Sequence, residues 1–378
     1  MCMVEPLDFR DEFLITKEFN YLDNAGLSPL PSSVIDACNG FMVERSRVGA
    51  LNYFEGWEGM RDRVADGFGD LISAGVDELA FTKNTHEGIN MVANMIQWKS
   101  GDNVVLNDLE FPANAFPWAH QRRHGVEIRV AKSRGGGVYP EDIEALVDDR
   151  TRVIALSHVA FINGFKHDLE AVGRIARRHG VLFVVDAMQS VGVVEVDVRG
   201  ACVDFLACGG HKWLLSPLGT GFFYVRRELL DEFEPPFVGL QGHDSGLLTG
   251  FTMEWNPHKS ARKFMTGNIN YAGFAGMERG LEIIHGIGLK RIMERVQGLT
   301  SQLVEEISNP DVVWQNPLEM KYRSSTLNFT VPKVDELLKQ LEALKIIVAP
   351  RGGGLRVSPN FYNTEEEISE LADVVNSF

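Results

Sequence analysis

The stretch Cys208-Gly209-Gly210-His211-Lys212-Trp213-Leu214-Leu215 follows directly on a short apolar run at residues 203–207. A second apolar run occupies residues 181–185, and Asp186 comes directly after it. Short runs of branched apolar residues predict strands that are buried on both faces of a sheet. Open α/β sheets bind ligands in the crevice at the carboxyl ends of their strands. We therefore expect Asp186 and Lys212 to meet in one such crevice.

A lysine and an aspartate in this arrangement suit pyridoxal 5'-phosphate (PLP). The Lys212 amine can form a Schiff base with the PLP aldehyde. Asp186 can hold the pyridine nitrogen protonated, so that the ring accepts electrons from a substrate carbanion. Taken singly, each residue has a plainer explanation, Asp186 as a helix cap and Lys212 as a solvated side chain. The two strands and the glycines before Lys212 favour the PLP site.

Two segments resemble the class V aminotransferase family. They are Phe183-Val184-Val185-Asp186-Ala187-Met188-Gln189-Ser190 and Gly210-His211-Lys212-Trp213-Leu214. The family includes cysteine desulfurases, selenocysteine lyase, isopenicillin-N-epimerase-like enzymes and, more distantly, kynureninase. The resemblance implies an α/β, fold-type I PLP-dependent transferase. Its large domain would have a central, mostly parallel sheet flanked by helices, and a smaller C-terminal α+β domain would follow.

Composition limits the classes of partner. The chain has 378 residues, 24% of them charged, and a net charge of −15, which argues against nucleic-acid and anionic-membrane partners. No apolar run approaches the roughly 20 residues that span a bilayer, and the N-terminus lacks the features of a signal peptide. The four cysteines, Cys2, Cys38, Cys202 and Cys208, form no CxxC pair and no metal-ligand spacing. We expect a cytoplasmic protein without a metal.

Apolar periodicity divides the chain into three parts. Residues 1–30 form an N-terminal arm that belongs to the small domain or to an active-site lid. Residues 31–270 form the large PLP-binding domain, and residues 271–378 form the small C-terminal α+β domain. Near the end of the chain, Pro350-Arg351-Gly352-Gly353-Gly354 is expected to be a mobile loop that could face the substrate.

A phosphate site is predicted after the strand at residues 79–82. Asn84 and Glu87 have the spacing of a helix-start capping box. The free N–H groups and the dipole of a helix N-terminus favour a phosphate there, and Thr85 and His86 add side-chain donors. The resemblance implies that this turn holds the PLP phosphate, although His86 stands where the family usually has threonine. His211, beside Lys212, is a further candidate near the cofactor.

The resemblance also implies contacts to the cofactor ring. Phe111 occupies the position at which desulfurases have a histidine stacked on the ring. Phenylalanine can stack there, but it cannot transfer protons. Gln189 matches a residue that hydrogen-bonds the ring oxygen. Phe161 stands where many relatives have a second such partner, an asparagine.

Three further residues are implied by the resemblance. Arg356 precedes a Tyr-Asn turn and is expected to bind the substrate α-carboxylate, a task that suits the planar guanidinium. Asn24, in Tyr21-Leu22-Asp23-Asn24-Ala25, is expected near the substrate. Thr266 is expected to reach the PLP phosphate of a neighbouring subunit, so the active site would be completed in a homodimer.

Together these residues predict an enzyme that acts at Cα of an amino acid, with Lys212 as acid and base. We place transamination first, because it needs no group beyond those named. The alternatives are a C–S lyase without a catalytic cysteine, an amino-acid epimerase or racemase, and a PLP-binding protein without turnover. A persulfide-forming desulfurase is disfavoured, because residues 345–356 contain no cysteine. The loops 49–56 and 234–258 are expected to determine the substrate side chain.

Overall fold

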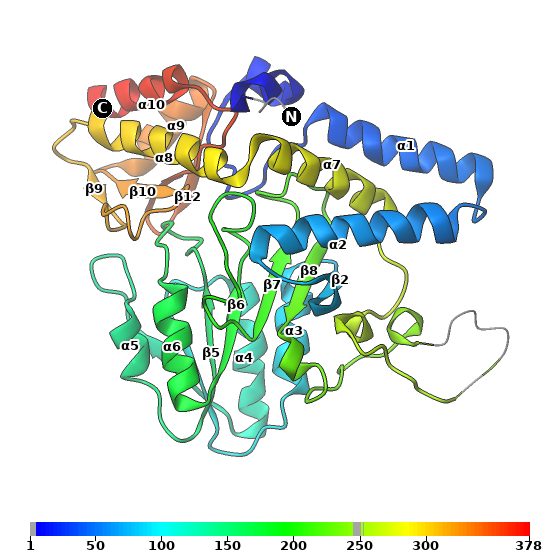
Figure 1. Cartoon of the computed structure of the whole chain (residues 1–378). Coiled ribbons are helices and arrows are strands. Elements are labelled where there is room, and N and C mark those ends of the chain that lie inside the picture. The colour runs from blue at the N-terminus through cyan, green and yellow to red at the C-terminus, as the bar shows by residue number, and fades with distance from the viewer. Residues whose placement is uncertain (1–4, 245–250, 252) are drawn as a thin grey trace.

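The computed structural model describes residues 5–244, 251 and 253–378 (Figure 1). Within these residues the larger sheet has seven strands. Strand β8 runs antiparallel to both its neighbours, and the other adjacent pairs run parallel. In spatial order the strands are β2 (Leu79–Thr82), β8 (Gly221–Val225), β7 (Phe205–Gly209), β6 (Leu182–Asp186), β5 (Thr151–Ser157), β3 (Asn103–Asn107) and β4 (Glu127–Ala131). The predicted, mostly parallel central sheet is confirmed.

Helices cover both faces of this sheet (Figure 1). Phe222 of β8 stacks on Phe68 of α2 (Glu58–Ile72), with ring centroids 3.8 Å apart. The next residue, Phe223, packs against Gly88 of α3 (Thr85–Met95). Successive strand residues point to opposite faces, so α2 and α3 lie on opposite sides. Three further helices of this region are α4 (Phe116–His120), α5 (Pro140–Glu144) and α6 (Leu169–His179).

The C-terminal part forms a second, smaller layer of helices and strands (Figure 1). Its antiparallel sheet has the order β12 (Ala349–Arg351), β13 (Gly354–Val357), β10 (Leu327–Thr330) and β9 (Val313–Trp314). Helices α8 (Leu289–Glu306), α9 (Val334–Ala343) and α10 (Glu365–Ser377) belong to this part. The predicted smaller α+β domain is confirmed, although β9 was not predicted. No helix among the described residues is long and apolar enough to cross a membrane.

The N-terminal arm joins the small domain. Strand β1 (Asn20–Tyr21) pairs in parallel with β11 (Ile346–Ile347), and Arg10 forms an ion pair with Glu367 of α10. Helix α7 (Tyr271–Ile287) packs on α1 (Ser32–Val48), and its buried side chains belong to the core of the large domain. Leu22 of the arm belongs to the core of the small domain, and the next residue along the chain that belongs to this core is Leu299 of α8. The predicted domain boundaries at residues 30 and 270 stay a prediction.

The segment expected to be a mobile loop at residues 350–354 is instead a tight hairpin, so that expectation is wrong. Pro350 and Arg351 belong to β12, which pairs with β13. Only Gly352 and Gly353 form the turn, with φ values of 58° and 76°. A two-residue turn with both φ values positive favours glycine strongly. A run of three glycines therefore fits a hairpin turn as well as a flexible loop, and composition alone does not distinguish them.

Candidate active site

One cavity brings together most of the residues predicted for the site. It lies at the carboxyl ends of β5, β6 and β7, in the crevice where Asp186 and Lys212 were expected to meet. Eight predicted residues line it: Thr85, His86, Phe111, Asp186, Gln189, His211, Lys212 and Arg356. Their roles toward a cofactor and substrate remain predictions. The Gln189 side chain donates to the Ala25 carbonyl and accepts from the Trp213 indole N–H.

Asp186 and Lys212 form the buried polar centre of the cavity. Asp186 is the last residue of β6 and is 4% exposed, and its Oδ1 accepts a hydrogen bond from the Met188 N–H at 2.9 Å. Burial raises the pKa of Asp186 to about 6, against the opposing effect of Lys212. Burial, together with the charge of Arg356, lowers the pKa of Lys212 to about 8. The Lys212 amine is thus neutral much more often near pH 7 than an ordinary lysine.

The start of α3 borders the same cavity. Asn84 caps this helix, and its side chain accepts a hydrogen bond from the Glu87 N–H at 3.0 Å. Glu87 accepts from the Lys83 N–H at 2.6 Å rather than from Asn84, so only half of the predicted capping box forms. The other N–H groups at the start of the helix have no partner within the helix and can bind an anion. Thr85 and His86, the first two residues of the helix, both line the cavity.

Phe111 forms an aromatic wall opposite the lysine. Its ring centroid lies 5.9 Å from Lys212 Nζ, and the side chain is 38% exposed, so it is not a core residue. Phe161 and His86 each meet the Phe111 ring edge to face, at 5.0 and 6.1 Å between centroids. This wall leaves one face of Phe111 available to a flat ring near Lys212.

Arg356 projects from β13 to the far side of the cavity. Its Nη2 pairs with Asp23 Oδ1 at 2.8 Å, and its Nη1 donates to the Phe161 carbonyl at 2.7 Å. The Nε atom is buried and has no hydrogen-bond partner in the described part of the chain. Arg356 also lines the cavity, so its guanidinium is placed to bind a carboxylate there.

Comparison with known proteins identifies the family. A family model described as aminotransferase class-V matches residues 20–371. The chain belongs to the class V aminotransferase family. A probable cysteine desulfurase of Methanothermobacter thermautotrophicus is 33% identical over 99% of this chain and 98% of its own.

Solved structures agree on the fold. The apo cysteine desulfurase of Thermococcus onnurineus NA1 is 28% identical and has a TM-score of 0.89, covering 99% of this chain and 98% of its own. A C-DES mutant with glycine covalently linked to its PLP cofactor has the same TM-score at 21% identity, covering 98% and 99% of the two chains. The predicted fold-type I architecture is confirmed, and PLP is the cofactor of this class V enzyme.

The residues of the cavity fit PLP. Asp186 is a buried carboxylate that can pair with a protonated pyridine nitrogen. The free N–H groups of α3 suit a phosphate. His211 lines the cavity next to Lys212, and its Nδ1 atom is buried without a partner among the described residues. No group of three or more His, Cys, Asp or Glu residues within the described ranges has a metal-binding arrangement.

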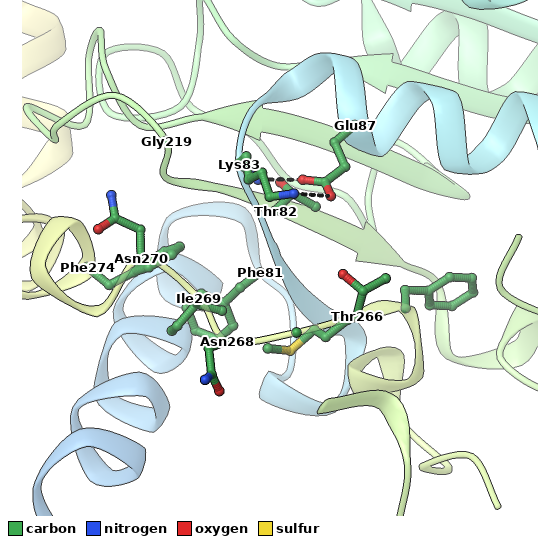
Figure 2. Close-up of a pocket in the computed structure, with 13 residues that line it drawn as sticks. Phe81, Thr82, Lys83, Glu87, Gly219, Thr266, Asn268, Ile269, Asn270 and Phe274 are labelled. Atoms are coloured by element: carbon green, nitrogen blue, oxygen red, sulfur yellow. Dashed lines mark hydrogen bonds and ion pairs between the residues drawn. The ribbon is translucent and has the colours of Figure 1, made fainter. Parts of the chain in front are cut away.

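Two predicted residues lie elsewhere. Asn24 is fully buried outside the cavity, where its side chain donates to the Ser358 carbonyl and accepts from the Tyr362 hydroxyl. It holds the arm on the small domain, so a direct substrate contact by Asn24 is not seen. Thr266 lines a second cavity, beside Thr82, Lys83 and Asn268 (Figure 2). Within one chain Thr266 is not part of the Lys212 cavity.

The loops expected to determine the substrate side chain also lie outside this cavity. None of the described residues of the loops 49–56 and 234–258 lines it. Residues Tyr53–Trp57 form a π-helical turn that leads into α2. Residues 245–250 and 252 of the second loop lie outside the described residues. The selection of the substrate side chain by these loops stays a prediction.

Two residues next to the substrate end of the cavity were missed from the sequence, Asp23 and Arg351. Asp23 left no periodic signal in the sequence, because strand β1 ends at Tyr21 and the pairing of Asp23 with Ser358 is an isolated bridge. Arg351 was expected only as part of a mobile loop that could face the substrate, and its place in the cavity depends on the hairpin of β12 and β13.

The lowered pKa of Lys212 predicts how the cofactor-free enzyme takes up PLP. The neutral amine is the reactive form, so the uptake rate should rise as pH passes through about 8. Between pH 7 and 9 the neutral fraction grows about tenfold and then levels off. An ordinary lysine pKa near 10.5 would give a rate that still climbs steeply at pH 9. Stopped-flow absorbance of PLP capture measures this profile.

Replacing Arg356 by lysine should weaken amino-acid binding. Lysine keeps the charge beside Asp23, but it cannot donate to Asp23, to the Phe161 carbonyl and to a carboxylate in one plane. We expect KM for amino-acid substrates to rise at least about tenfold, with a smaller change in kcat. Steady-state kinetics and a melting curve check this. An unchanged KM in a fully folded R356K variant contradicts the carboxylate role of Arg356.

Proposed function

We propose that this class V enzyme breaks the carbon–sulfur bond of cysteine or a cysteine derivative by β-elimination. We further propose that it releases the sulfur product directly, without storing it as a persulfide on one of its own cysteines. From the sequence alone, a C–S lyase without a catalytic cysteine was an alternative, and transamination was placed first. The relatives named above support C–S cleavage, since they are cysteine desulfurases.

The observation that carries the second half of the proposal is the hairpin of β12 and β13. A persulfide-forming enzyme needs a nucleophilic cysteine on a loop that precedes the carboxylate-binding arginine. Here Arg351 and Gly354 pair directly, with a two-residue turn between them. Residues 345–356 contain no cysteine, and the two-residue turn provides no loop on which such a cysteine could stand.

The cysteines elsewhere do not replace such a nucleophile. Cys38, Cys202 and Cys208 are unpaired, and none of these three lines the Lys212 cavity. Cys208 lies closest in sequence to Lys212, but it is 1% exposed, and burial raises the pKa of its thiol strongly. A thiol of raised pKa is a poor nucleophile, since the thiolate is the reactive form. Cys2 lies outside the described residues.

The described residues support each step of β-elimination. When bound, PLP supplies an electron sink next to Cα of the amino acid. Arg356 holds the α-carboxylate, and Lys212 removes the Cα proton. The Cβ–S bond then breaks, and its electron pair leaves with sulfur. Addition of one water to the remaining three carbons gives pyruvate and ammonia, so no external reductant is needed.

Product analysis tests the proposal. Holoenzyme incubated with L-cysteine or L-cystine, without thiol or keto acid, should form pyruvate and ammonia in equal amounts, together with a sulfur product. Prior alkylation of accessible cysteines with iodoacetamide should leave this activity unchanged. Alanine with a persulfide on the protein would indicate a desulfurase. Transfer of the amino group to a keto acid without release of sulfur would indicate a transaminase, and either result overturns the proposal.

We also propose that the enzyme works as a homodimer, in which Thr266 completes the phosphate site of the neighbouring subunit. The proposal is supported by the position of Thr266 in a cavity next to the start of α3, outside the Lys212 cavity of its own chain (Figure 2). Large apolar side chains nearby are also exposed, namely Leu218, Phe237 and Leu240. Light scattering of the purified holoenzyme measures its mass, and an active monomer rules out a shared site.

A further inference from the structure

We infer that Arg351 binds a second negative charge on the substrate, carried by the side chain rather than by the α-carboxylate. The preferred substrates would then be cysteine derivatives with an anionic group on sulfur, such as a sulfinate or an S-sulfonate. This inference rests on the proposed function for the reaction at Cβ. The substrate preference itself can be measured without turnover.

The hairpin fixes Arg351 next to Arg356. In the register of β12 and β13, Ala349 lies opposite Arg356 and Arg351 lies opposite Gly354. Residues that are opposite each other, or two apart along one strand, share a face of the sheet. Arg351 and Arg356 are thus diagonal neighbours on one face, a relation in which long side chains reach a common partner. Both line the Lys212 cavity.

The two arginines differ in how their charge is balanced. Arg356 is 1% exposed and is paired with Asp23. Arg351 is exposed, and its side chain donates to the carbonyl of its own neighbour, Pro350, at 2.8 Å. No carboxylate of the described residues lies within ion-pair distance of Arg351. A guanidinium that faces a ligand cavity without an acidic partner is available to an anion of the ligand.

The charge of Arg351 reaches the reacting centre. Its positive charge acts to lower the pKa of both Lys212 and Arg356, as nearby like charges do. In the proposed function Arg356 holds the substrate α-carboxylate, and Arg351 lines the same cavity without an acidic partner of its own. The Arg351 guanidinium is therefore available to a second anion of the substrate while Arg356 holds the first.

The fold keeps this cation in place. The turn at Gly352 and Gly353 is short, and its tip packs on Ile162, next to Phe161 in the wall of the cavity. Arg351 is anchored as a strand residue at the end of a two-stranded hairpin, so its backbone has little freedom. A side chain on a rigid element contributes more to specificity than one on a loose loop.

A matched pair of probes tests the inference. L-Aspartate and L-asparagine have nearly the same shape and differ by one negative charge, and their binding to the holoenzyme can be followed by the change in cofactor absorbance. We expect L-aspartate to bind about tenfold more tightly than L-asparagine. This factor is at the lower end of what a charge-assisted hydrogen bond contributes, because Arg351 stays exposed to solvent. This preference should fall as ionic strength rises.

Variants identify the source of the preference. R351Q should lose the preference for L-aspartate and bind L-asparagine as the wild type does, and R351K should retain part of it. K290Q, which removes an exposed charge on α8 outside the cavity, is the matched control and should behave as the wild type. Equal binding of both probes by the wild type, or equal weakening of both by R351Q, overturns the inference. Because no turnover is required, the result is independent of whether the enzyme forms pyruvate.

Discussion

Replacing Lys212 by alanine should lower kcat by at least about a thousandfold, since a positioned general acid–base group contributes 10²–10⁴-fold and this lysine is also the covalent anchor of the cofactor. Its amine stands 5.9 Å from the Phe111 ring centroid, and burial holds its pKa at about 8. No other lysine lines the cavity among the described residues, so no neighbour is placed to take over. Steady-state turnover with L-cysteine measures the loss.

The K212A variant needs controls that separate lost chemistry from lost structure. K132A removes a lysine that is 78% exposed and pairs with Asp108, and it should keep wild-type activity. PLP should still bind K212A, held by Asp186 and the start of α3, with the absorbance of the free aldehyde. A small external amine should restore part of the turnover. Residual activity above about a tenth of wild type would mean that another group moves the Cα proton.

The apolar runs of the sequence were sufficient to place the centre of the site. Strands β6 and β7 lie where those runs predicted them, and parallel strands that are neighbours in a sheet end at the same edge. Asp186 at the end of one strand and Lys212 just beyond the other therefore share one crevice. This inference needs only the identity of the strands and not their exact register.

The substrate side of the cavity could not be predicted in the same way. Asp23 and Arg356 pair although they are 333 positions apart. Their contact depends on the parallel pairing of β1 with β11 and on the bridge between Asp23 and Ser358. Two-residue strands leave no periodic signal, so sequence patterns do not fix which side of the arm faces the cavity. The family resemblance led us to expect Asn24 near the substrate, whereas its neighbour Asp23 is the residue that meets Arg356.

Replacing Asp186 by asparagine should also have a large effect, with kcat lowered by about 10²–10³-fold, as expected when one preorganised charge is lost. Asparagine has nearly the same shape and can still accept the hydrogen bond from the Met188 N–H. The amide carries no negative charge, so it cannot keep the pyridine nitrogen protonated, and the dissociation constant for PLP should rise together with the loss of kcat. Equilibrium dialysis of PLP and steady-state kinetics measure the two effects.

The same substitution should act in the opposite direction on the stability of the cofactor-free protein. Because burial raises the pKa of Asp186 to about 6, the folded state holds a proton more tightly than the unfolded state, and this contribution to stability is lost as pH rises through about 6. At pH 8 the cofactor-free D186N variant, which has no charge to bury, should melt at the same temperature as the wild type or higher. PLP should then raise the melting temperature of the wild type more than that of D186N. A cofactor-free D186N variant that melts well below the wild type at pH 8 would assign Asp186 a structural role. A buried carboxylate that serves only the cofactor lowers the stability of the cofactor-free fold at this pH, so its removal should not lower the melting temperature.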